Sequence, residues 1–420
     1  MDLREKLDLL GKAACYDDCV STPGSAAGTG GYGLFAQPSE FTASGPDMVP
    51  YVSHVCAPDG RSLPILKVLQ TSACQNDCLY CAFRSARDVR RAHFTPDELA
   101  RGFDLMQRAG VVRGLFLSSG IAGTARTMDE MLATAELLRY KYAFGGYLHL
   151  KLLPGVESAQ VARAVELADR VSVNLEAPTD ERLAGLAPLK HMAELMGPLR
   201  SAAECASQRQ DGEQLVPIAS QASRTRPQRP ESGGRALSPG WGGARLGMST
   251  QFVVGPAGET DRELLATAEA LYQRVGVSRA YYSAFTPVAG TPLEDAAPTD
   301  PRREFRLYQA DFLLRRYGFA VCELPFESGG LLDTEVDPKV AWAQAHPEHF
   351  PVEVNRAAVA DLLRIPGIGP VSARAIVSAR RQGPLRELGD LRRLGARAGL
   401  AAPYVLLSGR KLACQFRLLP

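Results

Sequence analysis

Long apolar segments are missing from this 420-residue chain. No apolar run reaches the roughly 18–20 residues that cross a bilayer. The N-terminal sequence MDLREKLDLLGKAAC mixes charge with leucine and lacks the pattern of a signal peptide. We therefore expect no membrane contact and a cytoplasmic location, where disulfides are rare and clustered cysteines more often bind metal.

What the chain does have is a cluster of three thiols. Residues 71–83 read TSACQNDCLYCAF and place Cys74, Cys78 and Cys81 in a C-x3-C-x2-C run. Four ligands would close a structural zinc site, whereas three thiolates can hold a [4Fe–4S] cube and leave one iron open. Zinc stays the alternative, although no fourth cysteine stands at finger-like spacing and the next histidine is His93.

Short apolar runs alternate with amphipathic helical patterns between residues 62 and 330. The expected strands are residues 62–70, 114–120, 147–155, 170–178, 249–255 and 279–287. Six βα alternations predict an α/β fold, a parallel sheet curled into a partial TIM-type (β/α)6 barrel. The carboxyl ends of such strands are the expected place for chemistry, and the cysteine run follows the first of them.

Composition divides the rest of the chain. Residues 1–61 form an N-terminal extension and residues 331–354 a connector. Residues 200–246 are rich in Gln, Ser, Pro, Arg and Gly, and they predict a disordered insertion in the barrel.

Residues 355–420 are strongly basic, with twelve Arg and Lys against three acidic residues. The stretch IPGIGP at 365–370 lies between two helical patterns and closely resembles a helix-hairpin-helix. This predicts a small all-α domain whose backbone amides bind phosphate. Its expected DNA-binding residues are Gly367, Ile368, Gly369, Arg374, Arg380 and Arg381. A second, degenerate hairpin is expected around Leu394 and Gly395. A structural or protein-binding hairpin is the alternative.

The cysteine run, with Tyr80 just before the third cysteine, resembles the signature of the radical S-adenosylmethionine (SAM) enzymes. The resemblance implies a [4Fe–4S] cluster on Cys74, Cys78 and Cys81 and SAM as cofactors. It would set Tyr80 against the adenine and the motif Ser118, Ser119 and Gly120 against the amino group. It would also set Asn174 and Glu176 near the ribose and methionine, and the backbone of Gly255 near the nucleoside.

Outside 24–48 and 200–246, the chain further resembles radical SAM proteins linked to DNA modification or repair and to a uracil-DNA glycosylase-like partner. The stretches that carry this include YDDC (16–19), CAPDGR (56–61), DRVSVNLEAPT (169–179) and HPEHFPVEVNRA (346–357). The chain departs from that pattern at Cys15, where lysine is expected, and at Ser62, where cysteine is usual. His149, Lys151, Cys19 and Cys56 are candidate substrate contacts. The alternatives are a packed histidine, a surface lysine and buried thiols.

The resemblance implies reductive cleavage of SAM to a 5′-deoxyadenosyl radical that acts on a DNA nucleotide. The implied partners are duplex DNA, the glycosylase-like protein and an electron donor such as flavodoxin or ferredoxin. No catalytic residue can be named. Two alternatives stay open: a radical SAM enzyme that modifies RNA, and a non-catalytic iron–sulfur adaptor that binds DNA for a glycosylase-type partner.

Overall fold

The structure, a computed structural model, describes residues 1–14, 52–56, 62–214 and 246–411. It divides into two compact units. The first comprises Met1–Glu259 and Leu271–Thr299, and the second comprises Thr260–Ala270 and Asp300–Pro420. The domain boundaries expected from composition are not tested by this division and remain a prediction.

A seven-stranded sheet forms the centre of the first unit, with its strands in chain order. The strands are β1 Val52–Cys56, β2 Ser62–Leu69, β3 Gly114–Ser118, β4 Tyr147–Lys151, β5 Arg170–Glu176, β6 Gly247–Val254 and β7 Arg279–Ala284. Strands β2 to β7 are parallel, as the six expected alternations require. β1 was not anticipated; it pairs antiparallel with β2 and sets Cys56 opposite Ser62.

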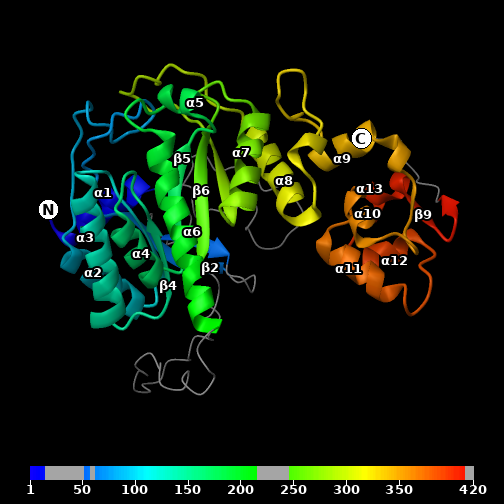
Figure 1. Cartoon of the computed structure of the whole chain (residues 1–420), viewed down its shortest axis with the longest axis horizontal. Helices are drawn as coiled ribbons and strands as arrows, with labels where there is room; N and C mark the ends of the chain where they lie inside the picture. Colours follow the sequence, from blue (N-terminus) through cyan, green and yellow to red (C-terminus); the bar gives the residue numbers. More distant parts are fainter. Residues whose placement is uncertain (15–51, 57–61, 215–245, 412–420) are drawn as a thin grey trace. The chain divides into compact units, whose positions relative to one another are not determined.

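The sheet is curled into a half-barrel, which confirms the predicted partial barrel (Figure 1). Tyr281 of β7 packs in one buried cluster with Val55 of β1, Ile65 of β2 and Phe116 of β3. Strands at opposite edges of a flat seven-stranded sheet would lie too far apart for such contacts. The curl therefore brings the inward-facing side chains together in one core.

The helices that connect successive strands lie along the outside of the sheet (Figure 1). They are α2 Pro96–Arg108, α3 Thr124–Glu136 with the π-helical turn η2 Leu137–Lys141, α4 Ser158–Leu167, α5 Asp180–Ala184 and α6 Met192–Gln214. Helix α1 Leu3–Ala13 precedes β1 in the chain, and α7 Asp261–Arg274, which follows β6, belongs largely to the second unit. Helix α2 begins with a capping box. Thr95 Oγ1 accepts from the backbone N–H of Glu98, and the Glu98 carboxylate accepts from that of Thr95.

One boundary of the expected insertion was wrong. Helix α6 continues to Gln214, so residues 200–214 are helical rather than disordered. Leu195, Leu199 and Ala202 are fully buried, and this apolar face explains why the helix continues into a polar sequence. Residues 215–245 lie outside the described part of the chain. Among the described residues, no helix is both long and apolar enough to span a membrane.

The second unit contains the basic C-terminal module. Its elements are α8 Pro301–Tyr317, η4 Val321–Glu323, α9 Pro338–Ala345, η5 Pro347–His349, β8 Val352–Glu353, α10 Val359–Arg364, α11 Pro370–Ala379, α12 Leu388–Arg393, α13 Ala398–Ala401, η6 Ala402–Tyr404, β9 Val405–Leu407 and β10 Arg410–Lys411. The predicted helical C-terminal domain is present, and besides its helices it includes a small sheet of β8, β9 and β10. Val405 and Leu407 of β9 are buried in the core of the four short helices α10 to α13, which explains why an edge of sheet belongs to this module.

Candidate functional site

The three clustered cysteines lie in the loop that follows β2, at the carboxyl end of the barrel strands. Backbone hydrogen bonds fix this loop to two other strand ends. The N–H of Gln75 donates to the carbonyl of Ile121 after β3 (2.7 Å). The N–H of Leu79 donates to the carbonyl of Leu186, beyond β5 (2.8 Å). The loop is therefore held in place by its own backbone before any metal binds.

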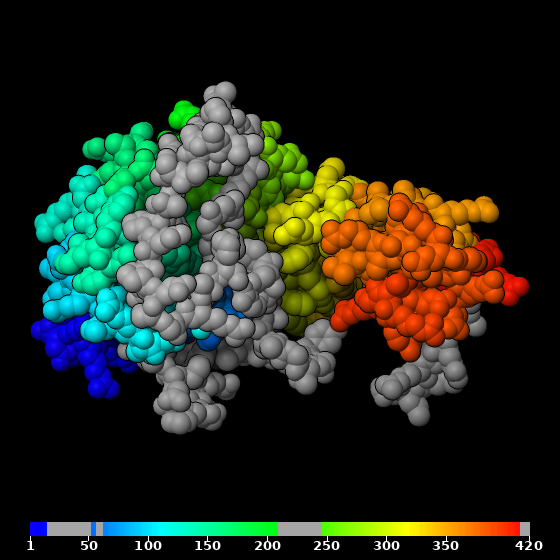
Figure 2. All heavy atoms as spheres, turned by 90° about the horizontal axis from the view of Figure 1, so that it is seen from below, coloured from blue at the N-terminus to red at the C-terminus, as the bar shows by residue number. Residues whose placement is uncertain are grey.

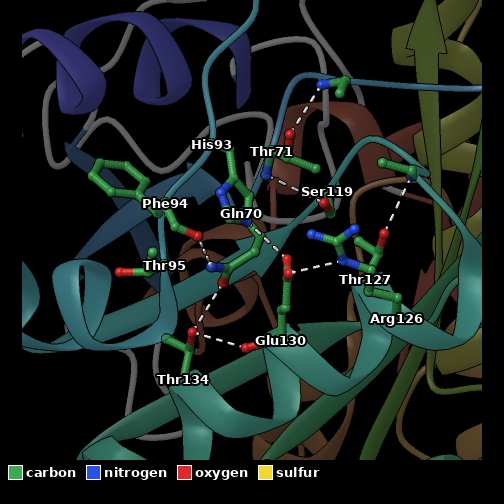
Figure 3. Close-up of polar contacts among 12 residues, drawn as sticks. Gln70, Thr71, His93, Phe94, Thr95, Ser119, Arg126, Thr127, Glu130 and Thr134 are labelled. Atoms are coloured by element: carbon green, nitrogen blue, oxygen red, sulfur yellow. Dashed lines mark hydrogen bonds and ion pairs between the residues drawn. The ribbon is translucent and has the colours of Figure 1, made fainter. Parts of the chain in front are cut away.

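Buried polar side chains hold the base of the loop (Figure 3). The amide of Gln70 donates to the carbonyl of Phe94 (2.6 Å) and accepts from the hydroxyl of Thr134 (2.9 Å). The hydroxyl of Thr71 donates to the carbonyl of Ala92 (3.0 Å). Satisfied hydrogen bonds in a buried site define one geometry, since the alternatives would leave polar groups unpaired.

His93 lies on the outer side of this base (Figure 3). Its Nε2 is 2.8 Å from Oε2 of Glu130, and the guanidinium of Arg126 contacts the other oxygen of Glu130 at 3.4 Å. The histidine nearest in sequence to the cysteines is thus engaged by a carboxylate. The zinc alternative gains no fourth ligand from it.

A cavity of about 140 Å³ opens where the cysteine loop meets the ends of β3, β4 and β5. Its lining contains most of the residues that the sequence predicted for cluster and cofactor. They are Cys74, Cys78, Cys81, Tyr80, Ser118, Ser119, Gly120, Asn174 and Glu176. The structure thus brings side chains from separate segments of the chain into one site.

The thiols in this cavity are shielded from solvent. Burial raises the pKa of Cys78 to about 11, although the ammonium of Lys190 opposes the rise. Burial also raises the pKa of Cys81. Without a metal these thiols are protonated at neutral pH, so a bound metal would replace their protons and be favoured by rising pH.

Glu176 and Lys190 form a buried ion pair beside the cysteines. The ammonium of Lys190 lies 2.9 Å from Oε1 of Glu176. The Lys190 side chain is 11% exposed and the Glu176 side chain is 4% exposed. Burial alone would lower the pKa of Lys190, but the negative charges of Glu176 and, once it is deprotonated, of Cys78 outweigh burial and raise this pKa. Burial and the Glu176 carboxylate together raise the pKa of Tyr80. Sequence reasoning missed Lys190; a lysine after a short helix carries no signal of burial.

One oxygen of Glu176 is available to a ligand. Its Oε2 is buried and makes no hydrogen bond to any described residue. Glu176 also has φ +65°, and the pairing of β5 with β6 shifts register between Asn174 and Glu176. A strained, bulged strand end with an unsatisfied carboxylate is typical of a binding site.

The backbone of the cysteine loop packs so closely against Gly120 that a side chain there would overlap it. A Cβ at this position would lie 2.3 Å from the carbonyl oxygen of Ala73, and the Gly120 N–H donates to the carbonyl of Thr71 (2.7 Å). The hydroxyl of Ser119 accepts from the N–H of Thr71 (3.3 Å). This motif therefore supports the loop, while its predicted contact with the cofactor amino group remains a prediction.

The remaining polar candidates differ in position. Asn174 donates to Oε1 of Gln251 (3.2 Å), and Gln251 in turn donates to the hydroxyl of Ser283 (2.8 Å). Lys151 lines the cavity. His149 is fully buried inside the barrel, where its Nε2 lies 2.8 Å from the hydroxyl of Ser172, and it is not among the residues that line the cavity.

Gly255 also lies outside the cavity lining. It has φ +114°, its N–H donates to Glu259, and a Cβ there would overlap Thr299 at 1.9 Å from Oγ1. These contacts explain on structural grounds why glycine stands at position 255. Cys19 lies outside the described residues, and for Cys56 the structure describes only the backbone at the end of β1.

The predicted hairpin is present in the second unit, but most groups of its loop already contact other residues of the module. Gly367 has φ +83°, and a Cβ there would lie 2.6 Å from the carbonyl oxygen of Arg397. Ile368 is buried, and its carbonyl accepts from the ammonium of Lys339 of α9 (2.6 Å). The N–H of Gly369 donates to Ser372 Oγ (2.8 Å). The amide of Gly369 is therefore already engaged within the hairpin, and Pro370, the first residue of α11, has no N–H to offer.

The basic residues of the module divide into two groups. Arg380 donates to the carbonyls of Val354 and Ala357 at 2.9 and 2.7 Å, so it has a structural role. Among the described residues, the following are exposed and have no carboxylate partner within 4 Å: Arg374, Arg381, Arg386, Arg392, Arg397, Arg410 and Lys411. Figure 2 shows this module in orange and red. Its surface carries the charge that a phosphate backbone attracts.

Comparison with family models yields two matches. Residues 68–199, which contain the cysteine loop and strands β3 to β5, match the radical SAM superfamily. The chain carries a radical SAM domain. Residues 349–396 match a helix-hairpin-helix motif, which includes α10, α11 and α12.

The chain is also distantly similar to several solved structures. Methylornithine synthase (PylB) is 12% identical over 59% of this chain and 60% of its own, with a TM-score of 0.43. The FeFe-hydrogenase maturase HydG from Carboxydothermus hydrogenoformans is 12% identical over 59% of this chain and 50% of its own, with a TM-score of 0.41. A radical SAM methyltransferase from Sphaerobacter thermophilus is 12% identical over 61% of this chain and 65% of its own, with a TM-score of 0.40.

This chain thus spans between half and two thirds of the length of these structures. Likenesses so distant carry no argument about substrate or partner. No curated protein sequence matches the chain.

Proteins of the radical SAM superfamily use a [4Fe–4S] cluster and SAM. The residues of this cavity fit both groups. Three thiols converge without a fourth protein ligand among the residues that line it, which suits a cluster with one open iron. The unsatisfied Oε2 of Glu176 suits a donor such as an amino or hydroxyl group, and the cation of Lys190 lies beside it.

Proposed function

We propose that this protein is a radical SAM enzyme that acts on a nucleotide of DNA, in modification or repair. The observation that carries the catalytic part is the convergence of Cys74, Cys78 and Cys81 with Tyr80 and Glu176 in one cavity at the strand ends. The nucleic-acid part rests on the helix-hairpin-helix match and on the exposed arginines of the module.

In the proposed site, the three thiolates hold the cluster. When bound, cluster and SAM supply a 5′-deoxyadenosyl radical that removes a hydrogen atom from carbon. Tyr80 provides a partly buried aromatic surface for the adenine, and Glu176 accepts a hydrogen bond at Oε2. Lys190 balances the negative charge of the thiolates, and its own pairing with Glu176 fixes the orientation of that carboxylate.

Lys151, which lines the cavity at the end of β4, is the proposed substrate contact, and Asn174 at the end of β5 is a proposed cofactor contact. The contact of Asn174 with Gln251, and of Gln251 with Ser283, extends polar groups across β5, β6 and β7. Such a row of amide and hydroxyl groups suits the polar edge of a nucleobase. A base would need to leave the stack to reach it.

Duplex DNA is the proposed partner of the module, bound through its backbone with little sequence preference. A glycosylase-type protein and a flavodoxin or ferredoxin remain proposed partners that follow from the family resemblance. The oxygen sensitivity of an open cluster would favour a reducing cytoplasm.

The deciding experiment is anaerobic. The full chain is reconstituted with iron and sulfide, reduced and mixed with SAM, and 5′-deoxyadenosine is quantified with and without undamaged, deaminated or oxidised duplex DNA. We expect cluster-dependent product from the wild type and a rise in its rate with one DNA. A Cys322→Ser variant is the matched control, because Cys322 is an exposed free thiol in the second unit.

The alternatives give different results. An RNA-modifying enzyme would produce 5′-deoxyadenosine that structured RNA stimulates and duplex DNA does not. A non-catalytic adaptor, with a full cluster measured by iron content, would yield no 5′-deoxyadenosine above a Cys78→Ala blank. Either outcome would replace the proposed DNA-directed activity.

A further inference from the structure

Three metal-ligating side chains meet on the segment between α9 and β8. They are His346, Glu348 and His349, and their ligand atoms all lie within 4.8 Å of one another. Nδ1 of His346 is 3.0 Å from Oε1 of Glu348, and Nε2 of His349 is 3.8 Å from the same oxygen. The cluster belongs to the second unit and is separate in sequence from the cysteine loop.

A buried indole orients both imidazoles. The ring of His346 lies 4.7 Å from the ring of Trp342 with a 36° tilt, and that of His349 lies 5.3 Å away with a 30° tilt. Trp342 is only 3% exposed and packs edge-on against Phe319 at 5.3 Å, so it is a fixed surface. Stacking on a fixed surface reduces the rotamer entropy that the histidines would lose on binding a ligand.

The spacing is close to what a metal requires. With metal–nitrogen and metal–oxygen bonds of about 2.0–2.2 Å, tetrahedral ligand atoms stand roughly 3.4 Å apart. The two distances to the Glu348 oxygen lie on either side of this value. The side chains of Glu348 and His349 are 64% and 57% exposed, so small rotations can bring the third pair of atoms together.

The ligand types select the class of metal. Two imidazoles and one carboxylate suit zinc, nickel and copper better than magnesium or calcium, which prefer oxygen ligands. A simple ion pair between Glu348 and a histidine would explain one of these contacts. The approach of both imidazoles to the same carboxylate oxygen is also the arrangement in which one nitrogen of each ring can ligate a metal.

We propose that His346, Glu348 and His349 form a site for one divalent transition metal of the zinc and nickel class, with solvent in the remaining positions. The metal would fix the segment that enters β8 and thereby the start of the helix-hairpin-helix module. The proposal concerns this segment alone and does not depend on the reaction at the cysteine loop.

The test uses the second tryptophan of the chain. The protein contains two tryptophans, Trp241 and Trp342, so a Trp241→Phe background leaves Trp342 as the only indole. In the cluster-loaded full chain under anaerobic conditions, Ni²⁺ is added while the fluorescence of Trp342 is followed. We expect saturable quenching with a stoichiometry of one, reversed by Zn²⁺ as a competitor.

Two variants and one control make the outcome specific. Glu348→Gln keeps both stacked rings and removes the carboxylate, and we expect it to weaken Ni²⁺ binding by at least about tenfold. His349→Gln should do the same, whereas His54→Gln, which changes an exposed histidine of β1, should leave binding unchanged. Quenching that never saturates, or that is equal in Glu348→Gln and wild type, would overturn the proposal.

Discussion

The cavity of the first unit and the module of the second handle charge in opposite ways. In the cavity, Glu176 and Lys190 are paired and almost inaccessible to solvent. In the module, most arginines are exposed and lack a carboxylate partner among the described residues. Two buried charges in contact interact strongly because the surrounding dielectric is low, whereas the interactions of exposed charges are weakened by water and screened by salt. The first arrangement suits the orientation of a reactive cofactor, and the second suits a long-range attraction to a polyanion.

The comparison also separates two uses of glycine. Gly120 allows two backbone segments to approach within contact distance beside the cysteines, whereas Gly367 has a positive φ and packs against the backbone of Arg397 and Ala401. The first glycine therefore bears on the geometry of the site. The second bears on the core of the module, where Ile368 is buried.

The largest effect is expected from Cys78→Ala. Removing one of the three ligands should abolish the cluster and all formation of 5′-deoxyadenosine. The affinity of the module for DNA should stay within about twofold of wild type, which corresponds to a change in binding free energy of under about 0.4 kcal/mol. Iron content, product analysis and anisotropy with labelled duplex DNA measure these three quantities. An equal loss of DNA binding would show that the two regions do not act independently.

The next largest effect should come from breaking the buried ion pair. Lys190→Met leaves the Glu176 carboxylate buried without its partner, and the unfolding free energy of the first unit should fall by about 3–5 kcal/mol. Denaturation of the full chain measures this. The double variant Lys190→Met/Glu176→Leu should recover much of the stability but not SAM binding. A double variant that still binds SAM would argue against a role of this pair in the cofactor site.

A smaller effect should follow from Arg374→Gln combined with Arg381→Gln. Removing one phosphate contact should reduce the slope of log affinity against log salt by about 0.9, so removing two should reduce it by about 2. Duplex DNA binding between low and moderate salt is the measurement. Arg393→Gln is the matched control, because Arg393 already pairs with Asp390 at 2.8 Å. An unchanged slope in the double variant would place the DNA contact elsewhere.

The smallest effect concerns Lys339, whose buried ammonium donates to the hairpin carbonyl of Ile368. Burial lowers the pKa of Lys339 to about 7, from an ordinary 10.5. Between these two values the unfolded chain binds more protons than the folded chain, so the contribution of Lys339 to stability rises with pH and is lost as pH falls toward 7. Wild type should therefore gain stability relative to Lys339→Met as pH increases from about 6 to about 9.5.

Thermal unfolding of the full chain in the Trp241→Phe background, followed at Trp342, measures that difference. A gap between wild type and Lys339→Met that does not depend on pH would show that Lys339 keeps its proton in the fold. The Arg374→Gln variant, exposed and far from this contact in sequence, provides the control for general pH effects.

Much of the first unit could be predicted because its signals are local. The six parallel strands correspond to apolar runs, and the three cysteines selected by their spacing line one cavity at the strand ends. The antiparallel strand β1 was missed, because its five residues carry no clear period. The sheet of the module was missed for the same reason, since β8 and β10 have two residues each.

The sequence by itself selected the three clustered cysteines as candidate ligands and determined which segments alternate between strand and helix, since spacing and periodicity are properties of neighbours along the chain. Only the tertiary structure decided that Lys190 pairs with Glu176, that His149 turns toward Ser172 rather than the cavity, and that Lys339 occupies the hairpin carbonyl. These contacts join residues up to 29 positions apart, and burial makes each of them energetically important. No local pattern encodes such contacts, because they arise from the curl of a sheet and the packing of helices.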